Sequence, residues 1–134
     1  MKPTIHHIAI AVRDLDAALE FYRDGLGLEL TERREAPEEG VEIAFLPAGG
    51  VEIELLCPQS SEGGVAAFIE KRGEGLHHIC VAVPDIEAAM AQLQASGARL
   101  SSESPRVDVH GTRYIFVHPQ SAHGVLLELY EMTT

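Results

Sequence analysis

Two stretches in which large and small apolar residues alternate predict a strand at the start of each half of the chain. They are residues 5–12 (IHHIAIAV) and 76–83 (LHHICVAV), and the second repeats the first at an offset of 71, which carries His7 onto His78. Successive side chains of a strand point to opposite faces. We therefore expect the bulky face of each strand to lie under a helix and the small-residue face to line a hollow that contains His7 and His78.

An amphipathic helix is predicted after each of these strands. Asp14 and Asp85 precede the apolar positions that recur at helical spacing, and both are suitable N-cap residues. Gly25 and Gly97 mark the ends of the two helices. The offset of 71 also carries Asp14 onto Asp85, so the repeat continues from the strand through the turn into the helix.

Short apolar strands separated by Gly, Pro and Ser follow each predicted helix. They are expected at 42–46 and 51–56 in the first half and at 114–117 and 125–130 in the second. The acidic cluster within 35–42 is expected to be a solvated face or loop. The order strand, helix and about three strands thus occurs twice, and we expect the two halves to build one joint sheet.

Length and composition favour one domain. The chain has 134 residues, of which 46% are apolar, and we expect a single domain over 1–134 with repeat 1 at about 1–57, a connecting loop and helix at 58–73 and repeat 2 at about 74–134. The net charge of −11 argues against nucleic acid and acidic membranes, which require a basic face. The apolar run 8–12 is far below the roughly 20 residues of a membrane span. We expect a soluble, cytoplasmic protein with no membrane partner.

Four residues at equivalent positions of the two repeats carry metal-ligating side chains. His7 and His78 lie in the opening strands, and Glu54 and Glu128 lie in the closing strands. Each of them alone is most simply a satisfied core histidine or a solvent-facing glutamate. A carboxylate in an apolar strand is costly unless it is paired or bound to a cation. The four together predict a metal site where the halves meet, with a shell suited to divalent Co, Ni, Mn, Fe or Zn.

Other polar residues leave their roles open. His110 precedes Gly111 in a tight loop, where a substrate contact and an ordinary surface histidine are equally consistent with the sequence. Lys71 and Arg106 lie near predicted loop ends, where they either meet an anionic ligand or have no role. His6 and His77 fall on the opposite strand faces from His7 and His78, and we expect them to be structural.

Several motifs resemble the methylmalonyl-CoA epimerase family, which belongs to the vicinal oxygen chelate superfamily. They are the paired segments 7–12 and 76–81, the Phe-Val-His-Pro of 116–119 leading to the Gly-Val-Leu-Leu-Glu-Leu of 124–129, and the helix at 67–71. The resemblance covers nearly the whole chain. The paired strands alone indicate only the superfamily, which also holds glyoxalase I, extradiol dioxygenases and antibiotic-resistance proteins, whereas the ending and the middle helix favour the epimerases.

The resemblance implies an α+β fold of two βαβββ modules, which form a cupped mixed sheet with a metal site between them. It implies one divalent ion per chain, Co²⁺ first and Ni²⁺, Mn²⁺, Mg²⁺ or Zn²⁺ as alternatives, with His7, Glu54, His78 and Glu128 as the metal ligands. Glu128 is the first and Glu54 the second candidate for catalysis. Some epimerases have a catalytic Glu at the position of Ile43, which leaves the second acid/base of this chain open.

The activity that the resemblance implies is interconversion of (2R)- and (2S)-methylmalonyl-CoA by abstraction of the α-proton through a metal-stabilised enolate. The implied partners are an acyl-CoA substrate and a second copy of the chain in a homodimer. His110, Arg106 and Lys71 are the candidate substrate-binding residues. The alternatives are a glyoxalase I-like isomerase (lactoylglutathione lyase), which would use the same ligands, and a metal-free drug-binding resistance protein, which would not need them. An extradiol dioxygenase would leave Glu54 surplus.

Overall fold

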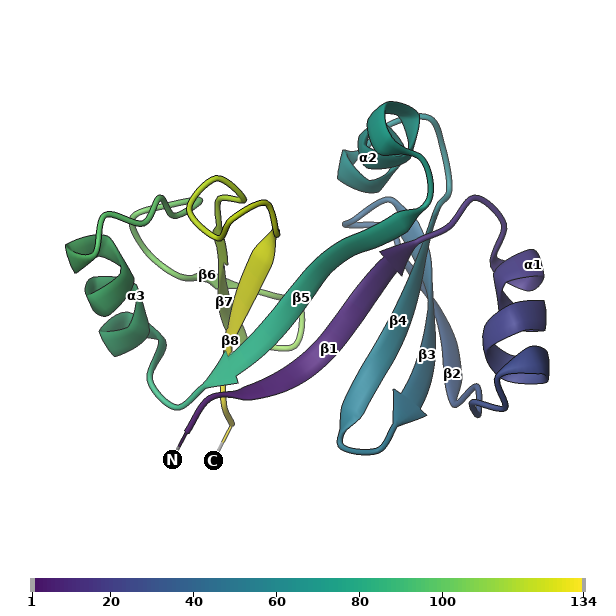
Figure 1. Cartoon of the computed structure of the whole chain (residues 1–134), viewed down its shortest axis with the longest axis horizontal. Coiled ribbons are helices and arrows are strands. Elements are labelled where there is room, and N and C mark those ends of the chain that lie inside the picture. Colours follow the sequence, from purple (N-terminus) through teal and green to yellow (C-terminus); the bar gives the residue numbers. More distant parts are fainter. Residues whose placement is uncertain (1, 134) are drawn as a thin grey trace. The chain divides into compact units, whose positions relative to one another are not determined.

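The computed structural model describes residues 2–133, in which a strand, a helix and three strands occur twice (Figure 1). The first module contains β1 (Thr4–Ala11), α1 (Leu15–Leu19) with its π-helical continuation η1 (Glu20–Gly25), β2 (Glu32–Ala36), β3 (Val41–Ala48) and β4 (Val51–Pro58). The second contains β5 (Gly75–Val83), α3 (Ile86–Ala95), β6 (Arg106–Val107), β7 (Arg113–Val117) and β8 (Leu127–Glu131). Helix α2 (Gly64–Arg72) connects them in sequence. The predicted α+β fold of two βαβββ modules is confirmed.

The sheet is mixed, because each module pairs its opening strand in parallel with its closing strand. In the first module β1 is parallel to β4, with Ala9 opposite Glu54, and β4, β3 and β2 are successively antiparallel. In the second module β5 is parallel to β8, with Cys80 opposite Glu128, and β8, β7 and β6 are antiparallel. The residue two positions after the motif histidine is thus the register partner of the glutamate in both modules.

Contacts divide the chain into two compact units, residues 7–77 and residues 78–133 together with 2–6. In the unit 7–77, helix α1 covers one face of the strands, where Leu15 and Leu19 pack against Leu46 and Leu55. In the other unit, α3 lies beside β7 and β8 (Figure 1), and its cluster is formed by Val83, Ile86, Met90, Ile115, Val117 and Leu129. The predicted packing of bulky strand faces under the following helices is therefore confirmed.

The small-residue face of β1 differs from the expected open hollow. Ala9 and Ala11 are fully buried in a second cluster of the unit 7–77, to which Val65 and Ile69 of α2 contribute. Small side chains on a strand let a helix approach closely, and α2 uses this space. The hollow is therefore filled along the part of β1 that follows His7.

Strand β2 is the third strand expected in the first module, and the sequence pattern did not locate it because it lies in a charged segment. The acidic cluster within 35–42 contributes to β2 and β3 rather than to a loop alone. Charged side chains are tolerated because β2 is an edge strand, which pairs only with β3 in the unit 7–77. Arg33 lies 2.7 Å from Asp16 of α1 and 3.0 Å from Glu42 of β3. Hydrogen bonds to Glu42 and Asp16 raise the pKa of the Arg33 guanidinium. These contacts join residues far apart in the sequence, so local patterning does not reveal them.

Both predicted N-caps are present. The Oδ1 atom of Asp14 accepts the Ala17 amide at 3.1 Å, and that of Asp85 accepts the Ala88 amide at 3.0 Å. The first helix changes to π-helical hydrogen bonding at Glu20, which local periodicity does not predict. Within residues 2–133 no helix has the length and apolar character that crossing a membrane requires.

Replacement of a core leucine tests the first module. Leu55 is fully buried between β4 and α1, so we expect Leu55→Ala to lower the free energy of unfolding by about 2 to 5 kcal/mol. Leu26→Ala is the control, because Leu26 is 57% exposed, and its effect should stay within about 0.5 kcal/mol. Urea titrations followed by circular dichroism measure both values. Similar midpoints for the two variants would contradict the assigned core.

The second module contains a carboxylate that links β8, β7 and α3. Glu131 accepts two hydrogen bonds of 2.9 Å from Arg113 and one of 3.1 Å from the Ile86 amide. The Arg113 hydrogen bonds, and then the Ile86 amide, lower the pKa of Glu131 from its ordinary value of 4.5. A pKa lower in the folded than in the unfolded state means that the carboxylate stabilises the fold above the ordinary pKa, and that this stability is lost as the pH falls below it.

Glu131→Gln should therefore be less stable than the parent at pH 7, and the difference should shrink as the pH falls below about 4.5. Urea unfolding of both proteins across this pH range measures it. Glu87→Gln serves as the control, because the Glu87 side chain is 70% exposed and lies 3.4 Å from Arg113, and should show little change. A deficit for Glu131→Gln that does not depend on pH would count against the pKa shift.

Candidate functional site

Four polar or charged residues are buried among residues 2–133, and they are the four candidates from the repeats. His7 is 2% exposed, Glu128 6%, His78 8% and Glu54 9%. Burial of an ionisable side chain is costly unless a partner or a bound cation compensates the lost hydration. Among the described residues, these four therefore carry the largest cost of burying ionisable side chains.

In the unit 7–77, the Nδ1 atom of His7 lies 3.3 Å from the Oε2 atom of Glu54. The parallel pairing of β1 with β4 brings the two side chains together, since Ala9 lies opposite Glu54 and His7 is two residues away on the same strand face. The two side chains are 3% and 12% exposed. This module therefore presents one shielded imidazole–carboxylate pair.

The unit that contains residues 78–133 repeats this arrangement. The Nε2 atom of His78 lies 3.1 Å from the Oε1 atom of Glu128, and the side chains are 9% and 8% exposed. Phe116, the register partner of Glu128 on β7, packs edge-on against the His78 ring with 5.8 Å between centroids. An aromatic ring on one side and the sheet below restrict the orientation of the imidazole.

The separations within the two pairs fit two ligands of one metal ion. Divalent zinc, as an example, binds imidazole nitrogen and carboxylate oxygen at about 2.0 to 2.2 Å. Ligand–metal–ligand angles between octahedral and tetrahedral then place the nitrogen and oxygen about 3.0 to 3.4 Å apart. The corresponding N···O distances in the structure are 3.3 Å for His7–Glu54 and 3.1 Å for His78–Glu128. Imidazole and carboxylate also suit divalent transition metals, so the donor atoms of each pair are compatible with a metal site.

The three candidate substrate-binding residues are exposed. Lys71 lies in the last turn of α2. Arg106 begins β6 and is the register partner of Tyr114, which is the register partner of Tyr130 on β8. Strand alternation therefore assigns Arg106 to the same face of the second module as Glu128. His110 lies in the turn before β7, where its amide donates to Asp108 at 2.9 Å.

The position of Ile43 carries no acid. Ile43 is 4% exposed and lies in the apolar cluster with Ala9 and Leu56. The adjacent Glu42 faces the other way and binds Arg33 at 3.0 Å, as strand alternation predicts. A second acid/base group must therefore come from elsewhere.

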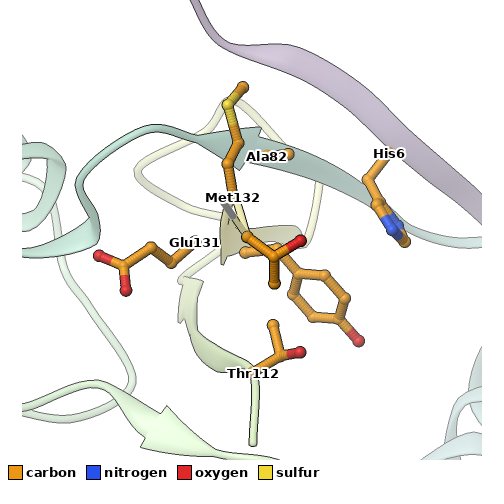
Figure 2. Close-up of a pocket in the computed structure, with 7 residues that line it drawn as sticks. His6, Ala82, Thr112, Glu131 and Met132 are labelled. Carbon is orange, nitrogen blue, oxygen red and sulfur yellow. The ribbon is translucent and has the colours of Figure 1, made fainter. Parts of the chain in front are cut away.

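The sequence pattern did not predict a hollow of about 300 Å³ in the unit that contains residues 2–6 and 78–133 (Figure 2). Its lining includes His6, Ala82, Thr112 and Tyr130. The His6 and Tyr130 rings lie 5.0 Å apart, and Tyr130 is two residues after Glu128 on the same strand. Alternation along β8 therefore places Tyr130 on the same face as Glu128, a relation that the sequence already contained. His77, the repeat equivalent of His6, instead packs on Phe68 with 5.0 Å between centroids.

Comparison with known proteins identifies the relatives of the chain. The model of the Glyoxalase/Bleomycin resistance protein/Dioxygenase superfamily matches residues 6–116. The ethylmalonyl-CoA/methylmalonyl-CoA epimerase of Cereibacter sphaeroides is 41% identical, over 96% of this chain and 97% of its own. The mitochondrial methylmalonyl-CoA epimerase of Mus musculus is 39% identical, over 93% of this chain and 71% of its own.

A solved structure of an epimerase is also similar to this chain. A Streptomyces coelicolor methylmalonyl-CoA epimerase variant in complex with 2-nitronate-propionyl-CoA is 37% identical to this chain. The match covers 97% of each chain with a TM-score of 0.85. The similarity therefore extends over both modules.

Proposed function

Because this chain belongs to the methylmalonyl-CoA epimerases of the glyoxalase/bleomycin resistance protein/dioxygenase superfamily, we propose that it interconverts the two epimers of methylmalonyl-CoA in a metal-dependent reaction. The chain is an epimerase of this family by its similarity to named epimerases. The observation that carries the mechanism is the pair of buried His–Glu contacts at equivalent positions of the two modules. The acyl-CoA analogue bound to the Streptomyces relative supports an acyl-CoA substrate.

We propose His7, Glu54, His78 and Glu128 as the residues that hold one divalent ion, with two ligands from each module. Their donor chemistry and the N···O separations of 3.3 and 3.1 Å support this assignment. Co²⁺ is the first candidate, followed by Ni²⁺, Mn²⁺, Mg²⁺ and Zn²⁺. When bound, such an ion supplies Lewis-acid stabilisation of negative charge on substrate oxygens.

The proton chemistry is proposed for the two glutamates. The reacting carbon of methylmalonyl-CoA lies between a thioester and a carboxylate, so loss of its proton leaves an enolate whose charge is spread onto the thioester oxygen. One carboxylate oxygen of Glu128 accepts this proton, and Glu54 in its protonated form delivers a proton to the opposite face of the same carbon. The reverse reaction exchanges the two roles. Burial of both side chains keeps bulk water away from the enolate.

Contacts to the rest of the substrate belong to the same proposal. Arg106, His110 and Lys71 are assigned to the anionic and polar groups of coenzyme A, because all three are exposed and two of them are cationic. A homodimer and a cytoplasmic location are further parts of the proposal, supported by the family resemblance.

Exchange of the α-proton tests the function. Metal-loaded protein is incubated with (2S)-methylmalonyl-CoA in heavy water, and α-deuterium and optical purity are followed by mass spectrometry and chiral analysis. We expect deuterium uptake together with loss of optical purity, and EDTA should abolish both. An untouched substrate, with consumption of methylglyoxal and glutathione instead, would favour the glyoxalase I-like alternative and overturn the proposal.

Removal of the proposed base should block catalysis. We expect Glu128→Gln to lower kcat by about 10²- to 10⁴-fold, the usual contribution of general acid–base catalysis. Glu52→Gln is the matched control, because Glu52 lies two residues before Glu54 on β4 and is less buried; its kcat should stay within about twofold of the parent. The decisive measurement is the rate of α-deuterium uptake with metal content checked. Parent-like exchange by a metal-loaded Glu128→Gln protein would refute the assignment.

Metal binding should raise stability, whatever the substrate. Free Co²⁺ at about 100 times its Kd should stabilise the parent by about 2.7 kcal/mol, since the ion binds the folded state. We expect His78→Ala to lose most of this gain and His110→Ala, in an exposed turn, to keep it. Thermal unfolding with and without Co²⁺ measures the gain. An equal gain in His78→Ala would exclude His78 as a ligand.

A further inference from the structure

An arginine lies on the same sheet face as the His7–Glu54 pair. Arg34 on β2 is the register partner of Ile43 on β3, and Phe45, two residues along β3, is the register partner of Glu54. These side chains therefore share one face of the first module. The Cζ atom of Arg34 lies 5.1 Å from the centroid of the Phe45 ring. The guanidinium is therefore displaced along the sheet from Ile43, its own register partner, toward Phe45, the register partner of Glu54.

Arg34 differs from its neighbour on the strand in its surroundings. Arg33 points to the opposite face and binds the carboxylates of Asp16 and Glu42. Arg34 is half-buried, its Nε atom is inaccessible to solvent, and Phe45 beneath it belongs to the edge of the apolar cluster around Ile43. A guanidinium placed over an aromatic ring in such surroundings is weakly hydrated and held in a defined orientation.

Arg34 differs from the other ionisable residues on this strand face in its positive charge. By alternation, the other ionisable residues that β1 to β4 place on this face are His7, Glu32, Glu52 and Glu54, so Arg34 is the one arginine or lysine that these described strands place there. The whole chain carries a net charge of −11 and repels anions at long range. An anionic group that enters this face therefore needs a local cation.

We propose that Arg34 binds the free carboxylate of a malonyl-type thioester and thereby selects such substrates over acyl-CoA esters without that group. The proposal rests on the proposed function, in which the substrate carries a carboxylate on the reacting carbon. A guanidinium presents N–H donors in a fork that matches the two oxygens of a carboxylate. Apolar packing on Phe45 orients this fork before the substrate arrives. Arg34 is thus a specificity-determining residue, distinct from the proposed proton carriers.

The test compares two ligands that differ by the carboxylate. Metal-loaded parent, Arg34→Gln, Arg34→Lys and Arg33→Gln are titrated with racemic methylmalonyl-CoA and with propionyl-CoA by calorimetry. We expect Arg34→Gln to weaken methylmalonyl-CoA binding by about 10- to 100-fold, which corresponds to loss of a charge-assisted hydrogen bond. Propionyl-CoA binding should change less than about twofold. Arg34→Lys should show an intermediate loss, because it keeps the charge and loses the fork.

Arg33→Gln is the matched control for loss of one positive charge on the same strand, and it should preserve the affinity ratio of the two ligands. The ratio is measured within each protein, so partial unfolding, which weakens both ligands alike, does not imitate the expected result. Equal weakening of both ligands by Arg34→Gln would assign the residue to the phosphates of coenzyme A or to packing, and would overturn the proposal. An unchanged Kd for methylmalonyl-CoA would also overturn it.

The two proposals fail separately. If the parent binds methylmalonyl-CoA but exchanges no α-proton, the proposed function is wrong, while a ratio that depends on Arg34 still supports carboxylate recognition. If exchange proceeds normally in the parent and the ratio does not depend on Arg34, the specificity assignment is wrong and the epimerase stands.

Discussion

The constraint on which the rest of the structure depends is the burial of two carboxylates in an apolar sheet. Glu54 and Glu128 are 9% and 6% exposed, and each lies within 3.3 Å of an imidazole nitrogen of its own module. Carboxylates in such positions demand compensation, which an imidazole or a cation supplies. Parallel pairing of the opening and closing strands meets this demand, because it sets the histidine beside the glutamate in each module.

The helices and the apolar clusters follow from this arrangement. The strand faces opposite the pairs are bulky and packed under α1 and α3, so they supply the hydrophobic driving force that the polar faces lack. On the face that carries His7 and Glu54, α2 and the ring of Phe45 complete an apolar cluster around Ile43. The four buried histidine and glutamate side chains thus lie on strands rather than on loops.

The net charge of the chain is −11, so the anionic substrate of the proposed function requires cations at specific positions. Arg33 forms ion pairs with Asp16 and Glu42 and so contributes to the fold of the first module. Arg34, one residue away, takes the opposite face because side chains alternate along β2. A single strand thereby divides its two arginines between stability and recognition.

The amino-acid sequence by itself determined the two-module order, the N-caps Asp14 and Asp85, and the strand faces of the four candidate ligands, because alternation, capping and repeats are local signals. The structure shows the first two and the burial of the four residues; metal binding stays a prediction. The sequence did not reveal β2, the hollow beside Tyr130 or the closeness of Arg34 to Phe45 and the Glu54 row. These depend on strand register and on pairing between distant segments, which only tertiary structure decides.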